Sequence, residues 1–418
     1  MPGKEEVDMG LIDNLLGRSN TTQRDKITLG GVVIPYRLEP CHFLFAGSTG
    51  TGKTTLFDEA LSKIIARGDR VIVCDPNGYH LSHFYQDGDV IFNPFDRRSQ
   101  GWSIFNEVRK DYDYDRLAKS VIPIGNGSDA QWHHYAQVLL AESLRALMLR
   151  GENSTEALIR WATTVSREEL AKLLDGSPAQ GLFDIDAAKA LASTRFILTS
   201  YLSAHKYMQG GDFSLRDWLQ NGRGNLYITW REDMQSSLIP LISTWVDILA
   251  NAVLSLAPSE DRRVWLALDE LGGLGKITSL ESALTRGRKY GLCVMAGLQS
   301  TSQLDRVYGR DGAIVLRSCF RNLVVLGIAK SDPETAETLS KSLGEREVER
   351  TQKNRSEGPQ GITHGVTIQQ KTERVALASE ITELPDLTAY LALAANNPTV
   401  LVKFNPIKLP IVVNGLEE

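Results

Sequence analysis

The sequence predicts an α/β protein with a mainly parallel central sheet and a small all-α domain inserted into it. Two patterns support this prediction. Short apolar runs alternate with segments of helical spacing in two blocks, residues 27–102 and 214–418. Between these blocks, residues 103–213 contain few strand signals and several stretches of helical spacing. We therefore expect one discontinuous α/β domain, an all-α domain over residues 103–213, and a polar N-terminal segment over residues 1–26.

The first block predicts a strand, a helix and a second strand in that order. Short strands are expected within residues 27–35, followed by a buried strand at residues 42–46. Apolar residues then recur at helical spacing over residues 56–65, and Gly68 can end this helix. Residues 70–75 form the next apolar run. Because strand, helix and strand follow each other closely, we expect a right-handed parallel unit.

Periodicity and apolar runs predict the remaining elements. In the inserted domain, helices are predicted at residues 135–149, 156–164, 166–174 and 187–205. In the second block, strands are predicted at residues 225–230, 264–268, 292–296 and 323–326, and helices at residues 236–256 and 332–344. Residues 345–372 are polar with mixed charge, so we expect a mobile excursion or a hairpin there.

The composition is that of a soluble globular protein, with 42% hydrophobic and 23% charged residues. The net charge of −5 argues against a uniformly basic surface, although a channel can still concentrate positive charge locally. Four cysteines without a CxxC pair argue against a zinc site. The most apolar stretch, residues 238–257, is interrupted by Pro240, Asp247 and Asn251. We therefore expect a buried helix there and no membrane-spanning segment.

Residues 47–54 carry a motif that binds phosphate. They read Gly-Ser-Thr-Gly-Thr-Gly-Lys-Thr and match the pattern G-x-x-x-x-G-K-[ST] in full. The predicted strand before them and helix after them allow backbone N–H groups and the positive helix end to face the phosphates. Lys53 would contact the phosphates and Thr54 would ligate Mg²⁺. The predicted nucleotide-binding residues are Gly47, Ser48, Thr49, Gly50, Thr51, Gly52, Lys53, Thr54 and Thr55.

Two acids, Asp269 and Glu270, follow the apolar run at residues 264–268. We expect this strand to lie beside the strand of the phosphate-binding loop. Asp269 would then hold Mg²⁺, and Glu270 would polarise the attacking water in phosphoryl transfer. The alternative is a strand that ends in two solvated acids. The intact phosphate-binding loop favours the catalytic interpretation.

The next predicted strand is preceded by a basic run and followed by Gln299. An amide at this position can sense the γ-phosphate, and the alternative is an ordinary turn residue. The basic run contains Arg286, Arg288 and Lys289. These cations can complement the end of a helix, or one arginine can reach the nucleotide of a neighbouring subunit as an arginine finger. The residues alone leave both interpretations open.

Several stretches together resemble the type IV coupling proteins of bacterial conjugation. Besides the phosphate-binding loop they are VIVCDPNG (71–78), WLALDE (265–270), ALTRGRKYGLCVMAGLQSTSQLDRVYG (283–309), SCFRNLVVLG (318–327) and ASEITELPDLTAYL (378–391). The resemblance covers about residues 27–405. It implies a RecA-like domain that hydrolyses ATP with Mg²⁺, and a small all-α domain. It also implies a homohexameric ring with ATP at the subunit interfaces.

The resemblance assigns roles to residues already singled out: phosphate contact by Lys53, metal ligation by Thr54 and Asp269, water positioning by Glu270, γ-phosphate sensing by Gln299 and the arginine finger by Arg288. Arg286 is the alternative finger.

The resemblance also implies partners and a location. The partners are DNA, which we expect to be single-stranded and bound without sequence preference in a central channel, the relaxase with its relaxosome, and a type IV secretion channel. The implied activity is DNA transfer driven by ATP hydrolysis. Family members lie at the cytoplasmic face of the bacterial inner membrane and carry N-terminal membrane-spanning helices. This chain shows none, so we expect it to be soluble.

Other functions share parts of this pattern. A chromosome translocase of the FtsK type or a protein-secretion ATPase would need the same site. A nucleotide-gated adaptor without sustained turnover is an alternative of another class, but it would not need Glu270 and a finger. The sequence does not identify DNA-contacting side chains. Trp132, Arg350, Lys353 and Arg355 are candidates that it does not separate from ordinary surface residues.

Overall fold

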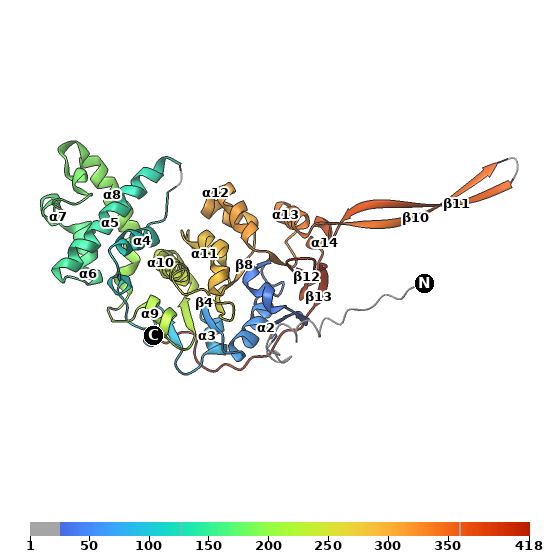
Figure 1. The fold of residues 1–418 in the computed structure, drawn as a ribbon, viewed down its shortest axis with the longest axis horizontal. Helices are drawn as coiled ribbons and strands as arrows, with labels where there is room; N and C mark the ends of the chain where they lie inside the picture. The colour runs from blue at the N-terminus through green and yellow to red at the C-terminus, as the bar shows by residue number, and fades with distance from the viewer. Residues whose placement is uncertain (1–25, 126, 359–360) are drawn as a thin grey trace.

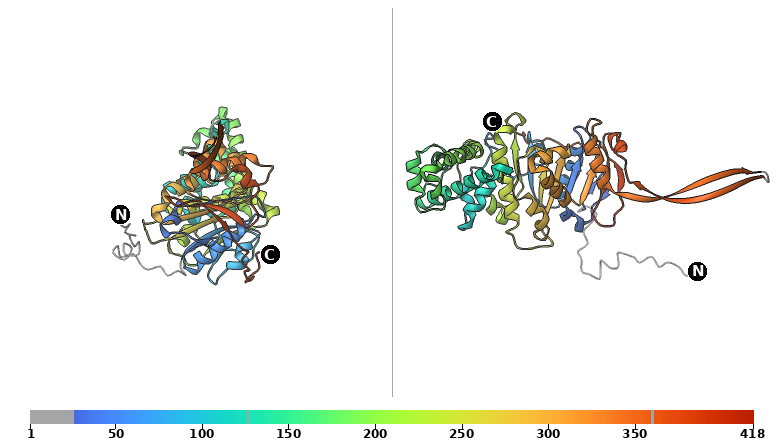
Figure 2. Two further views of the ribbon diagram at one scale, coloured as in Figure 1. Left: turned by 90° about the vertical axis from the view of Figure 1, so that its right-hand side faces the viewer. Right: turned by 90° about the horizontal axis from the view of Figure 1, so that it is seen from above.

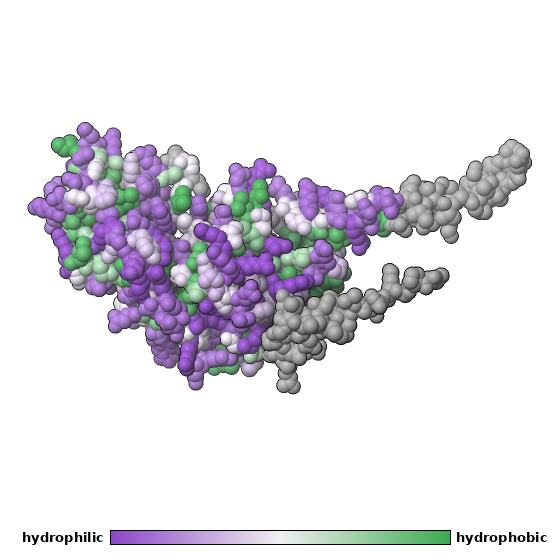
Figure 3. Space-filling view, in the orientation of Figure 1, coloured by the Kyte–Doolittle hydropathy of each residue, from purple (hydrophilic) through white to green (hydrophobic). Residues whose placement is uncertain are grey.

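The computed structural model describes residues 26–125, 127–358 and 361–418. The predicted polar segment at residues 1–26 therefore lies almost wholly outside the described residues. The molecule is elongated, with a helical lobe at one end, a sheet with helices on both faces in the middle, and a two-stranded ribbon at the other end (Figures 1 and 2). Hydrophilic side chains cover much of the face shown in Figure 3, with small apolar patches between them.

A nine-stranded sheet forms the centre of the molecule, in the order β13-β12-β9-β3-β8-β7-β4-β6-β5. Its strands are β3 (Phe43–Ala46), β4 (Arg70–Pro76), β5 (Val90–Phe92), β6 (Leu226–Trp230), β7 (Val264–Leu268), β8 (Leu292–Leu298), β9 (Asn322–Val325), β12 (Thr388–Ala392) and β13 (Val400–Lys403). All strands from β9 across to β5 run parallel, whereas β12 is antiparallel to β9 and β13. The predicted α/β fold with a mainly parallel sheet is confirmed.

The strand order corrects one expectation. The strand that ends before Asp269, β7, does not lie beside the phosphate-loop strand β3, because β8 pairs with both of them. Apolar runs identify buried parallel strands, but the crossover helices between them do not fix which strands become neighbours. The strands β5, β12 and β13 were not predicted. They are short, with three to five residues each, and lie at or near the edges of the sheet.

Side chains of the strands alternate between two hydrophobic clusters, one on each face of the sheet. One face is covered by α2 (Lys53–Ala66) and α3 (Tyr79–Phe84), together with the short strands β1 (Thr28–Leu29) and β2 (Val32–Val33). The other face is covered by α10 (Gln235–Val253), α11 (Leu280–Arg286) and α12 (Thr301–Cys319) (Figure 1). Because both faces are buried, the central strands are apolar along their whole length.

The helical lobe is formed by residues between β5 and β6. Its helices are α4 (Tyr112–Val121), α5 (Ala130–Arg150), α6 (Thr155–Ile159), a π-helical turn (Arg160–Thr164), α7 (Arg167–Leu173), α8 (Ala188–Leu202) and a 3-10 segment (Ser203–Tyr207). The four predicted helices are present, and α4 was not predicted. The chain enters and leaves the lobe at adjacent points, where Trp102 bridges Phe213. This closeness supports our proposal that residues 103–213 form an inserted domain.

The remaining elements lie at the other end of the molecule, and their two strands form a separate sheet. The helices α13 (Pro333–Leu343) and α14 (Ala378–Thr382) pack together, and the strands β10 (Glu345–Gly358) and β11 (Gly361–Arg374) form the antiparallel ribbon. The predicted hairpin is therefore present. Arg374 fixes its base through bonds of 2.7 and 2.9 Å to the Glu337 carboxylate. The side chains of residues 349–369, including three DNA-binding candidates, lie outside the described part of the structure.

In the described part of the chain, one helical stretch is long and apolar enough to cross a membrane. It covers Glu232–Val253, and 72% of its most apolar window is buried inside the protein. The stretch contains α10, which packs against the sheet and against α4. The expectation of a buried helix in this region is therefore confirmed.

His42 precedes β3 and is 2% exposed. Its Nδ1 accepts the N–H of Val294 at 3.2 Å, and its Nε2 donates to the carbonyl of Leu284 at 2.9 Å. Only the neutral imidazole can make both bonds. Burial lowers the pKa of His42 to about 4.

Acid should therefore destabilise the protein through His42. The folded pKa of about 4 lies below the usual 6.5, so the unfolded state takes up the proton first as the pH falls. The stabilising contribution is full above pH 6.5 and is lost towards pH 4. When the pH falls from 7 to 5, protonation linked to His42 should lower the free energy of unfolding by about 2 kcal/mol, as measured by urea unfolding. In His42→Gln the free energy of unfolding should fall by about 2 kcal/mol less than in the wild type over the same pH change. Equal losses in both proteins would contradict the prediction.

Candidate nucleotide-binding site

The phosphate-binding loop connects the end of β3 to the start of α2. The ends of the adjacent strands hold it, since Gly47 N–H donates to Leu298 O at 3.0 Å and Ser48 N–H to Gly327 O at 2.9 Å. Gly50 and Gly52 adopt φ values of 85° and 109°, which favour glycine over other residues. The loop therefore turns sharply into the N-terminus of a 14-residue helix. This geometry suits an anion such as a phosphate.

Two side chains of the loop stabilise the loop itself. The Thr51 hydroxyl donates to Ser48 O at 2.8 Å, and the Ser48 hydroxyl accepts the N–H of Ala329 at 2.8 Å. Thr49 and Gly50 are exposed, whereas Thr54 and Thr55 lie half-buried in the first turn of α2. The structure thus brings all predicted residues of the loop together at the carboxyl end of β3.

Lys53 is folded back over the loop. Its Nζ donates to Gly47 O at 2.5 Å and to Ser48 O at 3.0 Å. Burial lowers the pKa of Lys53, while the carboxylates of Glu270 and Asp269 act in the opposite direction. The ammonium therefore lies within electrostatic range of both acids, at the place where the loop would surround a phosphate.

Both oxygens of the Glu270 carboxylate are held by amides. Gln299 Nε2 donates to Oε2 at 2.7 Å and Gln303 Nε2 donates to Oε1 at 3.1 Å. Burial raises the pKa of Glu270, while the bond from Gln299 and the charge of Lys53 lower it. Gly297 allows β8 to pack closely against the backbone of Asp269, because a Cβ at this position would lie 1.9 Å from Asp269 O. The predicted acid and the predicted sensor thus form one bonded group.

Gln303 was not singled out from the sequence. It lies in the first turn of α12, where Ser300 and Gln303 form a capping box. Its Oε1 accepts the N–H groups of Gln299 and Ser300, each at 3.3 Å. The pattern Ser-Thr-Ser-Gln at residues 300–303 was the signal, since S/T-x-x-E/Q marks a helix start. Gln303 thus both caps the start of α12 and holds the Glu270 carboxylate in place.

Arg286 and Arg288 do not join this group within one chain. Both are exposed and lie at the amino end of β8, in α11 and in the following 3-10 turn η11 (Gly287–Tyr290). Gln299 follows the carboxyl end of the same strand. The seven residues of β8 span about 20 Å. Neither arginine can therefore reach the nucleotide site of its own chain.

The donor atoms present suit a metal that is shared with a ligand. Among the described residues, no group of three or more His, Cys, Asp or Glu side chains could hold a metal ion. Thr54 and Asp269 offer one hydroxyl and one carboxylate, which are hard oxygen donors of the kind that Mg²⁺ prefers. Mg²⁺ commonly completes such a set with waters and with phosphate oxygens of the substrate.

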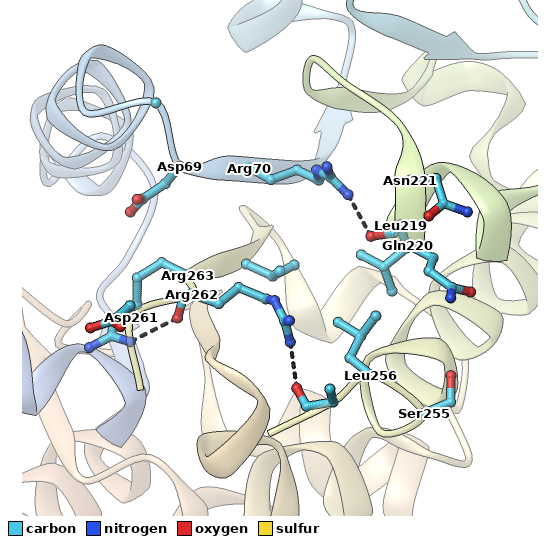
Figure 4. Close-up of a pocket in the computed structure, with 13 residues that line it drawn as sticks. Asp69, Arg70, Leu219, Gln220, Asn221, Ser255, Leu256, Asp261, Arg262 and Arg263 are labelled. Carbon is cyan, nitrogen blue, oxygen red and sulfur yellow. Dashed lines mark hydrogen bonds between the residues drawn. The ribbon is translucent and has the colours of Figure 1, made fainter. Parts of the chain in front are cut away.

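A cavity of about 590 Å³ lies away from this group, near the amino ends of β4 and β7 (Figure 4). Arg70 and Arg262 point into it, but both serve the fold. Arg70 donates to Leu219 O at 2.5 Å near the end of α9 (Leu215–Asn221), and Arg262 donates to Ala257 O at 2.7 Å. The cavity contains none of the predicted site residues.

Fold and loop together define a P-loop nucleotide-binding protein of the RecA-like α/β type. Residues 26–405 match the family described as the type IV secretion-system coupling protein DNA-binding domain. The chain therefore belongs to this family, as the sequence motifs predicted.

Individual relatives agree with this assignment. The coupling protein TraD of Escherichia coli K12 is 30% identical over 393 residues, which are 90% of this chain and 54% of TraD. The chain thus spans about half the length of that relative. The solved structure of the conjugative coupling protein TrwBdeltaN70 is 44% identical, with a TM-score of 0.90 over 97% of this chain and 94% of that one. TrwB in complex with ADP and Mg²⁺ is 44% identical, with a TM-score of 0.88 over 99% of this chain and 95% of that one.

Replacing Gln303 by leucine should destabilise the protein by about 1–3 kcal/mol. The change removes one donor from the half-buried Glu270 carboxylate and the acceptor for two backbone N–H groups. Urea unfolding would measure it. Ser302→Ala is the matched control in the same turn, because Ser302 is exposed, and its effect should stay within about 0.5 kcal/mol. If both variants unfold alike, Gln303 does not support the acid.

Proposed function

We propose that this chain is an ATP-hydrolysing coupling protein that translocates DNA in bacterial conjugation and links the relaxosome to a type IV secretion channel. The main support is the meeting of Lys53, Glu270 and Gln299 at one edge of the sheet, in a chain that belongs to the coupling-protein family. The TrwB structures with ADP and Mg²⁺ and with an ATP analogue support ATP and Mg²⁺ as the ligands.

The chain's own groups have distinct parts in the proposed reaction. Backbone N–H groups of residues 47–55 and the start of α2 bind the phosphates, and Lys53 exchanges its carbonyl partners for phosphate oxygens. Thr54 and Asp269 hold Mg²⁺, which neutralises phosphate charge when it is bound. Glu270 positions the attacking water and accepts its proton.

Gln299 connects this chemistry to the state of the nucleotide. Its amide donates to Glu270 at 2.7 Å and stands at the carboxyl end of β8, next to the loop strand β3. A γ-phosphate at this edge offers a competing acceptor for the amide. We propose that Gln299 senses the γ-phosphate by exchanging one partner for the other.

The arginine finger is proposed to come from a neighbouring subunit. Arg288, or Arg286 as its alternative, lies at the opposite end of β8 from Gln299. Composite sites of this kind require head-to-tail contacts, which form a ring when the rotation between subunits closes. We propose a homohexamer with one nucleotide at each interface.

DNA is the proposed cargo, supported by the family description as a DNA-binding domain. Movement along any sequence needs contacts to the phosphate backbone rather than to base edges. We propose single-stranded DNA held without sequence preference in the central channel of the ring. The relaxase with its relaxosome and the secretion channel are the proposed protein partners, at the cytoplasmic face of the bacterial inner membrane in the whole protein.

Lys53→Ala should abolish ATP hydrolysis, because the phosphate charge loses its cation. The wild-type rate should rise with single-stranded DNA and with protein concentration, and the stimulation should weaken at higher salt. Steady-state hydrolysis at two salt levels, with sizing in parallel, would test this. Wild-type turnover in Lys53→Ala would contradict the site. Indifference to DNA in confirmed rings would favour a protein-handling ATPase or an adaptor.

Arg288→Ala should bind nucleotide normally and hydrolyse it at least about 10³-fold more slowly. Mixed with Glu270→Gln subunits it should regain activity, because some interfaces then combine an intact acid with an intact arginine. Hydrolysis by mixed rings, compared with each variant alone, measures this rescue. Arg286→Ala in the same experiment decides between the two arginines. Without rescue in rings shown to be mixed, the trans role is wrong.

A further inference from the structure

A buried histidine lies directly behind Asp269. His80 is fully buried in α3, and the carboxylate of Asp75 fixes the start of this helix. Asp75 accepts the N–H groups of His80 at 3.0 Å and of Leu81 at 2.7 Å. The end of β4 therefore sets the position of the histidine backbone.

The imidazole ring has a fixed plane. It stacks on Phe57 and on Phe84, each at a centroid distance of 6.3 Å and an interplanar angle of 28°. Each of its two nitrogens lies near a carboxylate. Nδ1 lies 3.2 Å from Asp58 Oδ1, and Nε2 lies 3.9 Å from Asp269 Oδ2.

Neither ring nitrogen completes a hydrogen bond to a described residue, and the same holds for Asp58 Oδ1. Unsatisfied buried polar atoms are costly, so such a group calls for an explanation. The gap between Nε2 and Asp269 is less than 1 Å beyond a normal hydrogen bond. An N–H on Nε2 could therefore reach the Asp269 carboxylate after a small shift of either side chain.

We propose that His80 is a positioning residue for Asp269: it holds the inner carboxylate oxygen, Oδ2, so that the outer oxygen faces the metal. This inference rests on the proposed function, since it takes Asp269 as a metal ligand. Hydrogen bonds from a residue behind a metal ligand orient that ligand, and their loss typically weakens metal binding 10- to 100-fold. His80 would not touch nucleotide or metal itself.

The competing explanation is purely structural, in which His80 only compensates the buried Asp58. The two explanations separate when Asp58 loses its charge. His80→Leu leaves Asp58 without its imidazole partner, and Asp58→Asn in the same chain removes the charge of that carboxylate. The double variant should recover folding stability but not the orientation of Asp269. His80→Gln keeps an amide donor and should show a smaller metal defect than His80→Leu.

The experiment measures Mn²⁺ affinity of the full 418-residue chain with ADP, by electron paramagnetic resonance. Affinity for ADP in EDTA and the melting temperature are measured on the same samples. Tyr79→Phe is the matched control, because the Tyr79 hydroxyl donates to Asp58 at 2.8 Å rather than to Asp269. We expect Mn²⁺ binding at least 10-fold weaker in His80→Leu and in the double variant, with ADP affinity in EDTA and the Tyr79→Phe control unchanged.

Two results would overturn the proposal, and they have different consequences for the proposed function. If the folded double variant binds Mn²⁺ within twofold of the wild type, His80 is structural and the proposed function still stands. If the wild-type chain itself binds neither ADP nor Mn²⁺, the proposed function fails, and the role of His80 fails with it.

Discussion

The candidate site depends on one constraint, the arrival of three parallel strands at the same edge of the sheet. The register pairs Ala46 of β3 with Leu298 of β8, and Leu268 of β7 with Ala296 of β8. The phosphate-binding loop, Gln299 and the two acids therefore leave the sheet side by side. Both faces of these strands are buried, so hydrophobic packing holds them in register without polar contacts between the strands' side chains.

The sequence could predict those features that depend on local pattern. The phosphate-binding loop, the six strands β3, β4, β6, β7, β8 and β9, and the helices α2, α10 and α13 are each encoded within about 20 residues, and they were predicted with small errors at their ends. The helices α11 and α12, which follow β7 and β8, were not predicted. The acids after β7 were found for the same reason, since an apolar run ending in Asp269 and Glu270 is visible without knowledge of the fold. Local patterns of this kind do not encode the order of strands, which is why β8 was not expected between β3 and β7.

Residues that act through distant contacts were missed. Gln303 carries a helix-capping pattern, but its bond to Glu270 joins segments 33 residues apart. His80 lies in an unremarkable short helix, and its neighbours Asp58 and Asp269 come from two other elements. The arginines show the opposite case. Their basic run was visible in the sequence, but only the fold shows that they lie a strand's length from the site of their own chain.

Because Gln299 and the two arginines lie at opposite ends of β8, this strand has a second property in the proposed ring. Gln299, at its carboxyl end, belongs to the nucleotide site of its own subunit, whereas η11, at its amino end, would belong to the site of the next. Gly297 lets the strand pack directly on the backbone of Asp269, because a Cβ there would lie 1.9 Å from Asp269 O. In the proposed ring, β8 would thus connect the nucleotide site of each subunit to the nucleotide site of its neighbour. A linkage of this kind would couple the nucleotide affinities of adjacent sites reciprocally.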